Sequence, residues 1–139
     1  MVYQQTINKS VNFKGVGLHS GKVSNVRLIP HTADQGIIFK RVDLNEENIV
    51  KANFKNVTSA KLCTTLENSS GTKVSTIEHL LAAFYIEGID NVIVEIDNDE
   101  ITLMDGSSKD FVKILKDAGI KKLEKKRKFL KILNKVDFN

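Results

Sequence analysis

The stretch Ser75-Thr76-Ile77-Glu78-His79-Leu80-Leu81 predicts the first turn of an amphipathic helix. Apolar residues recur at i, i+3, i+4 and i+7, the spacing of one buried helix face, at Ile77, Leu80, Leu81 and Phe84. At about 100° per residue, Glu78 falls on the flank of this face and His79 falls nearly opposite to it. A carboxylate beside an imidazole, both away from the core, is a combination that suits a general base next to a metal ligand.

This helix sets the framework for the elements around it. It is predicted to begin at Thr76 and to end at Gly88, because glycine adopts the left-handed conformation that terminates helices without steric cost. The segment 91–96 is rich in β-branched residues and is flanked by turn residues, which is typical of a strand. A second helix is predicted from about Ser107 to Gly119. Its apolar residues have helical spacing: Phe111, Ile114, Leu115 and Ala118.

The N-terminal half carries short β-rich or alternating patterns separated by turn residues. The predicted strands are 11–13, 23–29, 36–39 and 62–66, and Asn68-Ser69-Ser70-Gly71 has the composition of a hairpin turn. Strands followed by helix, strand and helix are typical of an α+β fold. We therefore predict a two-layer sandwich in which a mixed, mostly antiparallel sheet carries two main helices on one face, with an additional strand-rich N-terminal region.

Composition and local sequence indicate the cellular compartment of the protein. Cys63 is the only cysteine, so an internal disulfide is excluded and a reducing compartment is indicated. The N-terminal residues have neither the basic nor the apolar region of a secretory signal. The longest apolar run, Leu80–Ile86, is far shorter than the roughly 20 residues of a membrane-spanning helix. We therefore expect a cytoplasmic protein for which any membrane contact is peripheral.

The net charge of +4 is concentrated near the C-terminus. Residues 121–131 contain six lysines and Arg127 against the single acid Glu124, so the rest of the chain is net acidic. A phosphate-binding surface interleaves basic residues with aromatics or presents them along a helix, whereas here only Phe129 accompanies them. A solvated linker is favoured over a nucleic-acid surface. The alternative function is that of a non-catalytic α+β module that binds an anionic or protein partner through this segment.

After the lysine-rich run, residues 129–136 alternate like the start of another strand. The simplest interpretation is that the chain is a fragment and that this strand opens a further domain. A terminal strand that completes the sheet of this domain is the alternative.

The Glu78–His79 pair has a purely structural alternative. Ser75 and Glu78 fit a capping box, in which the Glu78 carboxylate reaches back to the Ser75 amide. A histidine off the core face is most often a surface residue, and a catalytic zinc site needs three protein ligands. The chain has two other histidines, His19 and His31, and no H-x-x-x-H or H-x-x-x-D pair. Considered alone, these residues favour the cap.

Two further motifs have turn-like alternatives. Gly15–Gly21 carries His19 between predicted strands, and its glycine spacing does not match a dinucleotide-binding loop. Met104–Ser108 fits a turn followed by a helix with Ser107 as N-cap, although its amides could also bind an anion. Cys63 has no base near it in the sequence that would mark it as a nucleophile.

Five short blocks nevertheless occur in a fixed order: Gly15–Gly21, Leu62–Thr64, Ser75–Leu80, Gly88–Asn91 and Met104–Ser107. In order and spacing they resemble the N-terminal half of the bacterial UDP-3-O-acyl-N-acetylglucosamine deacetylases, the zinc amidases of lipid A biosynthesis. Five ordered blocks are far more specific than any one of them. Thr102 and Asp110 depart from the family pattern, which has prolines flanking the last block, and this affects local loop rigidity rather than the chemistry.

The resemblance implies an enzyme with its active site between two similar α+β domains. Residues 1–125 would form the first domain, and residues 126–139 the linker and the first strand of the second. Glu78 matches the family's general base, and His79 matches one of its three zinc ligands. The other two ligands and a general-acid histidine would belong to the second domain. The remaining matches are lower in specificity: Leu62 and Cys63 line the site, and His19 and Asp105 occupy motif positions without an assigned role.

The implied activity is zinc-dependent deacetylation, by amide hydrolysis, of UDP-3-O-acyl-N-acetylglucosamine. The Zn²⁺ cofactor would find one of its three protein ligands in this chain. We therefore expect the chain alone to be inactive and to require the second domain in cis. Apolar surface that this domain would cover is expected to favour self-association.

Overall fold

The computed structural model describes residues 2–138 of the chain. Its α-helices are α1 (Glu78–Glu87) and α2 (Lys109–Ala118), and a short 3-10 helix, η1, spans Phe54–Asn56. The strands are β1 (Tyr3–Ile7), β2 (Val11–Val16), β3 (Val23–Pro30), β4 (Ile37–Arg41), β5 (Ile49–Lys51), β6 (Val57–Ser59), β7 (Thr65–Glu67), β8 (Lys73–Val74), β9 (Val92–Ile96) and β10 (Ile120–Lys126).

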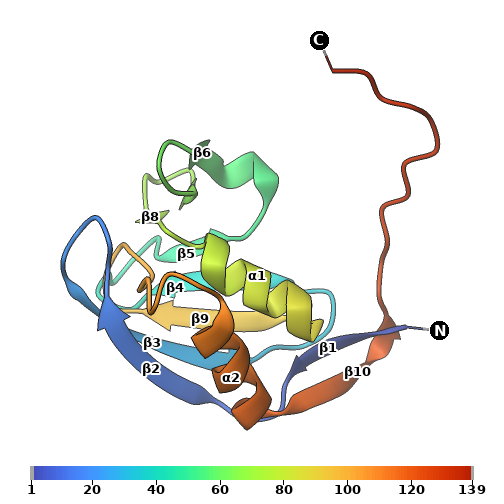
Figure 1. The fold of residues 1–139 in the computed structure, drawn as a ribbon, viewed down its shortest axis with the longest axis horizontal. Helices are drawn as coiled ribbons and strands as arrows, with labels where there is room; N and C mark the ends of the chain where they lie inside the picture. Colours follow the sequence, from blue (N-terminus) through green and yellow to red (C-terminus); the bar gives the residue numbers. More distant parts are fainter. Residues whose placement is uncertain (1, 139) are drawn as a thin grey trace.

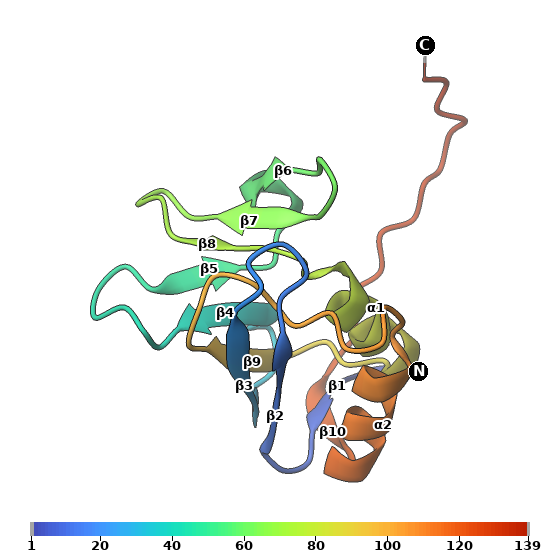
Figure 2. The same cartoon turned by 60° about the vertical axis from the view of Figure 1, so that its left-hand side comes forward.

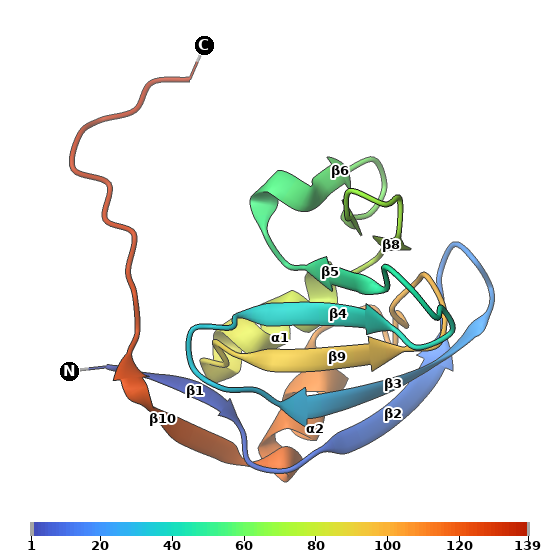
Figure 3. The same cartoon turned by 180° about the vertical axis from the view of Figure 1, so that it is seen from behind.

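The central sheet has the strand order β2-β3-β9-β4-β5. Strands β4 and β9 run parallel, and the other neighbours in this sheet are antiparallel. Both α-helices lie on the same face of the sheet, and its other face is seen from behind (Figures 1 and 3). The predicted α+β fold with a mixed, mostly antiparallel sheet and two helices on one face is confirmed. Among residues 2–138, no helix has the length and apolar character needed to cross a bilayer.

One apolar core lies between the sheet and the helices. Alternation along each strand directs every second side chain to the same face, so that in β3 Val26 and Leu28 are buried while Asn25 and Arg27 are exposed. The core also contains Phe39, Val50, Val92, Val94 and Ile96 from the sheet and Leu80, Phe84, Phe111 and Leu115 from the helices. This core fixes the body of α1 against the sheet.

Phe13 of β2 packs edge-on against Phe111 of α2, with ring centroids 5.6 Å apart. Such aromatic pairs stabilise by about 0.5–1.5 kcal/mol beyond the area they bury. We expect Phe13→Leu to lower the free energy of unfolding by about 1 kcal/mol in urea denaturation. Phe129→Leu is the matched control, because Phe129 is 72% exposed and its replacement should change little. An equal loss in both variants would contradict a stabilising role for the pair.

Most of the lysine-rich run is a strand. β10 pairs antiparallel with β1 in a separate two-stranded sheet. The Lys122 ammonium lies 4.0 Å from the centroid of the Tyr3 ring, and Lys125 Nζ lies 2.6 Å from Asp34 Oδ2. Exposed lysines on an edge strand hinder its pairing with other chains. The predicted solvated linker is therefore wrong for residues 121–126, because their partner β1 is distant in sequence and leaves no local signal.

Residues 127–138 form neither helix nor strand, and the chain leaves the domain at the end of β10 (Figure 1). Arg127 anchors this exit: its Nη2 donates to the Gly88 carbonyl at 2.8 Å, and its Nε lies 2.8 Å from Asp90 Oδ1. Residues 129–136 are exposed and pair with no strand in the described part of the chain, so the alternative in which they complete the sheet of this domain is wrong. That they open a further domain stays a prediction. The division at residue 125 stays a prediction.

A second small sheet, of order β6-β7-β8, stands beside β5 (Figure 2). The predicted turn at residues 68–71 connects β7 to β8: the Asn68 amide donates to the Thr72 carbonyl at 3.0 Å, and Gly71 has φ of 85°. The segment 62–64 leads directly into β7. This small sheet therefore carries the Leu62–Cys63 block.

Candidate active site at the start of helix α1

Helix α1 begins at Glu78, two residues later than predicted. Thr76 has φ of 55°, a left-handed conformation that a right-handed helix does not include, and Ile77 occupies the N-cap position without a side-chain cap. The Ser75 hydroxyl donates to the Asp99 carbonyl at 3.0 Å. The predicted capping box is wrong, because Ser75 is bound to a segment distant in sequence and not to the helix that follows it.

The rest of α1 agrees with the prediction. Its apolar face packs into the core with Ile77, Leu80, Leu81 and Phe84. Gly88 ends the helix with φ of 70°, and the Ile89 amide donates to the Phe84 carbonyl at 2.8 Å, the bond that closes this kind of helix end. Glu78 and His79 lie off the core face and are half-buried. The pair therefore sits at an accessible helix start.

Three residues around this helix start have an unusual backbone conformation. The φ angles are 67° at Leu62, 55° at Thr76 and 55° at Met104. A β-branched residue such as Thr76 is strained in this region, and strain of this kind clusters at functional sites. The residues within two positions of these three include predicted site residues: Cys63, Glu78 and Asp105.

Glu78 is tied to the Leu62–Cys63 block. Its Oε2 accepts a hydrogen bond from the Thr64 amide at 3.1 Å. Within residues 2–138, hydrogen bonds engage only this oxygen of the carboxylate, and Oε1 has no protein partner. Cys63 is half-buried next to Thr64, and Leu62 is 84% exposed. The structure thus brings the segment 62–64 to Glu78 through the Thr64 amide.

His79 is tied to the start of α2. The Ser108 hydroxyl donates to the His79 carbonyl at 2.9 Å. Helix α2 begins at Lys109 with Ser108 in the N-cap position, not Ser107 as predicted, because the Ser107 hydroxyl donates to Asp105 Oδ1 at 2.7 Å. That hydroxyl, together with the Ser107 amide, lowers the pKa of the Asp105 carboxyl. Asp105 is exposed and organises its own turn.

The loop between β2 and β3, which carries His19, is held by Glu100. The Oε1 atom of Glu100 accepts from the His19 amide at 2.9 Å, and its Oε2 accepts from the Ser20 amide at 2.7 Å. Oε1 also accepts from the Thr76 hydroxyl at 2.9 Å. One carboxylate therefore links the His19 loop to the residue that lies two positions before Glu78.

The environment of Glu100 favours its charged form. Glu100 is 2% exposed, and this burial raises the pKa of its carboxyl, but the hydrogen bonds from His19, Ser20 and Thr76 outweigh burial and lower the pKa to about 2. Because the folded-state pKa lies below the ordinary value of 4.5, these bonds stabilise the fold above that pH. Their contribution is lost as the pH falls through about 2.

A hollow of about 470 Å³ lies beside Ser75, in the segment that precedes α1, and neither Glu78 nor His79 lines it. Residues with polar or charged side chains contribute to its lining, among them His19, Ser59, Ser75 and Asp99, together with Cys63. His19 comes from the β2–β3 loop, and Ser59 and Cys63 come from the small sheet and the turn within it. Ser75 precedes Thr76, and Asp99 follows β9 and is hydrogen-bonded to Ser75. The hollow therefore places His19 and Cys63 at one cavity.

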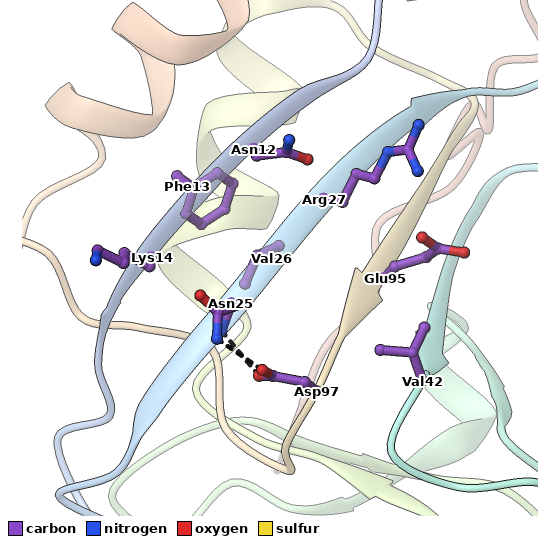
Figure 4. A pocket seen from close by; sticks show the side chains of 9 residues that line it. All are labelled: Asn12, Phe13, Lys14, Asn25, Val26, Arg27, Val42, Glu95 and Asp97. Atoms are coloured by element: carbon purple, nitrogen blue, oxygen red, sulfur yellow. Dashed lines mark hydrogen bonds between the residues drawn. The ribbon is translucent and has the colours of Figure 1, made fainter.

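A larger hollow of about 560 Å³ lies on the sheet face opposite the helices. Figure 4 shows its lining from β2, β3 and β9, with the Asn25 amide hydrogen-bonded to Asp97. No predicted site residue lines it. This hollow is therefore separate from the candidate site.

The chain offers one imidazole to a metal at the start of α1. Across residues 2–138, no three His, Cys, Asp or Glu side chains are grouped closely enough to hold a metal ion. Catalytic zinc takes three protein ligands and an open position, so the described residues do not form such a site by themselves. His31 lies elsewhere, in the loop after β3, where its amide donates to the Thr6 hydroxyl at 3.0 Å.

Sequence reasoning did not find Glu100 or Ser108. Glu100 follows the acidic turn Asp97-Asn98-Asp99 and has the local pattern of one more solvated acid. One feature of the sequence could have indicated that Glu100 is buried: it ends a polar run and directly precedes the apolar residue Ile101. Ser108 was considered within a turn motif, but its contact with His79 is a tertiary one.

Comparisons with known proteins identify the family of this chain. A sequence model of the UDP-3-O-acyl N-acetylglycosamine deacetylase family matches residues 4–139. The UDP-3-O-acyl-N-acetylglucosamine deacetylase of Wigglesworthia glossinidia brevipalpis is 46% identical over 133 residues, which are 95% of this chain and 45% of the relative. Those of Pasteurella multocida and Sodalis glossinidius are each 45% identical over 136 residues, 98% of this chain and 45% of the relative. The chain thus spans slightly less than half the length of these relatives. It belongs to the UDP-3-O-acyl-N-acetylglucosamine deacetylase family.

Proposed function

We propose that this chain supplies one half of the active site of a zinc-dependent deacetylase that acts on UDP-3-O-acyl-N-acetylglucosamine. The observation that carries the proposal is the Glu78–His79 pair at an accessible helix start, with the segments of His19, Cys63 and Ser108 gathered around it. The names of the relatives supply the substrate. The division of roles between the two side chains follows the family resemblance, and the hydrogen bond from the Thr64 amide to Glu78 supports it.

In this proposal Glu78 is the general base. Its Oε2 is oriented by the Thr64 amide, so Oε1 is the atom that accepts the proton of the attacking water as it adds to the acetamide carbonyl. His79 would hold the zinc ion through its neutral imidazole. The chemistry that zinc supplies when bound is polarisation of the acetamide carbonyl and activation of the water. The other two ligands would come from the second half of the protein.

The outer surface of α1 supports a second domain that covers it. A helix that is apolar on nearly all sides is normally buried on nearly all sides, and the sequence of α1 is polar only at Glu78, His79 and Glu87. Yet Tyr85 is 89% exposed and Ile86 is 62% exposed. We propose that this surface packs against the second domain and that the active site lies where the two domains meet.

In the isolated chain this apolar surface is expected to cause weak self-association. Ile86→Asp should shift the chain toward the monomer and raise its dimer dissociation constant by about tenfold, equivalent to about 1.4 kcal/mol. Sedimentation velocity over a concentration series measures this shift. Val42→Asp is the control, because Val42 is similarly exposed at 48% but follows β4 and is not on the helix side. If both variants associate like the unaltered chain, the α1 surface is not the contact.

The activity is tested in what we call the completed protein: this chain joined to the corresponding second half of the Pasteurella multocida relative. The completed protein is incubated with zinc and UDP-3-O-acyl-N-acetylglucosamine, and released acetate is measured. We expect acetate in proportion to the bound zinc. A folded, zinc-loaded completed protein that releases no acetate would overturn the proposed function.

A further inference from the structure

We propose that Glu100 is a positioning residue for the Glu78–His79 pair, acting as a clamp that joins the His19–Ser20 loop to Thr76 and so fixes where α1 begins. The catalytic meaning of this clamp rests on the proposed function. The clamp consists of hydrogen bonds among Glu100, His19, Ser20 and Thr76. Its existence is tested separately from the activity.

Both oxygens of the Glu100 carboxylate accept hydrogen bonds. Each oxygen of the Glu100 carboxylate accepts a backbone amide of the loop, and Oε1 accepts the Thr76 hydroxyl as well. The backbone of Glu100 is also held, since its carbonyl accepts the Ser24 hydroxyl at 2.6 Å and it bridges to Ser75. The side chain of Glu100 therefore binds the His19–Ser20 loop and Thr76, while its backbone binds Ser24 and Ser75.

The loop packs directly on the carboxylate. A Cβ atom added at Gly17 would lie 2.4 Å from Glu100 Oε2, a distance at which the carboxylate or the loop would have to move. Gly17 is itself buried. Glycine at position 17 is thus explained by the close approach of Glu100 and not by a positive φ.

The clamp acts on the residue that sets the helix start. Thr76 is held at φ of 55°, a conformation that a β-branched residue keeps only when its surroundings impose it. Its hydroxyl has Glu100 as partner, and Glu78 follows two residues later. Loss of this hydrogen bond would let Thr76 relax and move the first turn, and a displacement of about 1 Å in a catalytic group can lower turnover about 100-fold.

The contacts require a carboxylate at this position. Its hydrogen-bond partners within residues 2–138 are neutral backbone amides and hydroxyls, with no Lys or Arg among them. Glutamine would have to turn its NH₂ group toward one of these donors, because its amide has a single accepting oxygen. Glu100→Gln therefore breaks part of the clamp while keeping the side-chain volume.

The first test needs no activity. His19 and Ser20 are exposed, so slow hydrogen exchange at their amides would report their bonds to Glu100. In this chain we expect at least one of the two amides to exchange about tenfold more slowly than in Glu100→Gln, the size expected for a hydrogen bond to a charged group. Glu95→Gln is the matched control, because Glu95 pairs with Lys40 on the helix-free side of the sheet. Equal exchange rates in the unaltered chain and Glu100→Gln would overturn the clamp.

The second test measures turnover in the completed protein. We expect Glu100→Gln and Thr76→Val each to lower kcat by about 10-fold to 100-fold with KM changed less than about threefold, while Thr76→Ser, which keeps the hydroxyl, retains turnover. Rates are expressed per folded, zinc-loaded molecule, so a merely structural role would leave kcat unchanged. If Glu100→Gln does not fold, the kcat of Thr76→Val alone tests the positioning role. Unchanged kcat in Thr76→Val would overturn the positioning role, whereas a completed protein that never releases acetate would overturn only the proposed function.

Discussion

Replacing Glu78 with glutamine in the completed protein is expected to lower kcat for acetate release by about 10²–10⁴-fold, the range measured for removal of a general base. Glutamine keeps the size of the side chain and can still accept from the Thr64 amide, which holds Oε2 at 3.1 Å. It cannot take a proton from water. The loss should therefore appear in kcat more than in KM, because the substrate contacts are unchanged.

Glu87→Gln is the matched control for this experiment. Glu87 is the last residue of the same helix, is also half-buried, and lies 4.0 Å from Lys116. A surface pair of this kind contributes little, so Glu87→Gln should keep full turnover. If Glu78→Gln also kept full turnover at saturating zinc, Glu78 would not be the base.

Replacing His79 with glutamine is expected to weaken zinc binding by the completed protein more than about 100-fold. Changes in groups that merely support a ligand already cost about 10-fold to 100-fold, and His79→Gln removes a ligand outright. The measurement is competition with a chelator, read as bound zinc per protein molecule. Turnover should fall in parallel and should recover in part at high zinc concentration.

His31→Gln provides the comparison for His79. The structure ties His31 to the fold through its backbone amide, which donates to Thr6, and places it in the loop after β3, away from the start of α1. Its imidazole should therefore be dispensable for zinc. Equal zinc affinity in His79→Gln and the unaltered completed protein would refute the ligand assignment.

The elements that sequence patterns predicted well are those with their own local signal. Helix α1 repeats its apolar residues with helical period and ends at Gly88, and β9 is a run of β-branched residues. The start of α1 was misplaced because the capping-box pattern is local, whereas Thr76 and Ser75 are held by residues 99 and 100. A tertiary contact here overrides a local preference.

The strands β1 and β10 show the same limit. β10 has lysines at more than half of its positions and no apolar alternation, so nothing in it indicates a strand until Tyr3–Ile7 lies beside it. The basic segment was therefore interpreted as a linker. Its charge is explained by an exposed edge strand and by the ion pairs of Lys125 and Lys128 with Asp34.

The sequence predicted which residues belong to the candidate site, but it did not predict the hydrogen bonds that join them. Five blocks resembling one family identified Glu78, His79 and their neighbours, while helix periodicity placed the pair off the core face. The hydrogen bonds that join the blocks, from Thr64 to Glu78 and from Ser108 to His79, depend on the packing of three separate segments. Glu100 was missed for this reason, since its partners lie 24 and about 80 residues away.

The most direct measurement compares acetate release by this chain alone with release by the completed protein, at equal concentration and saturating zinc. We predict release from the completed protein and none above the buffer background from the chain alone, because His79 is one ligand where catalytic zinc takes three. Turnover by the chain alone at the rate of the completed protein would contradict the proposal that it carries half of a shared active site.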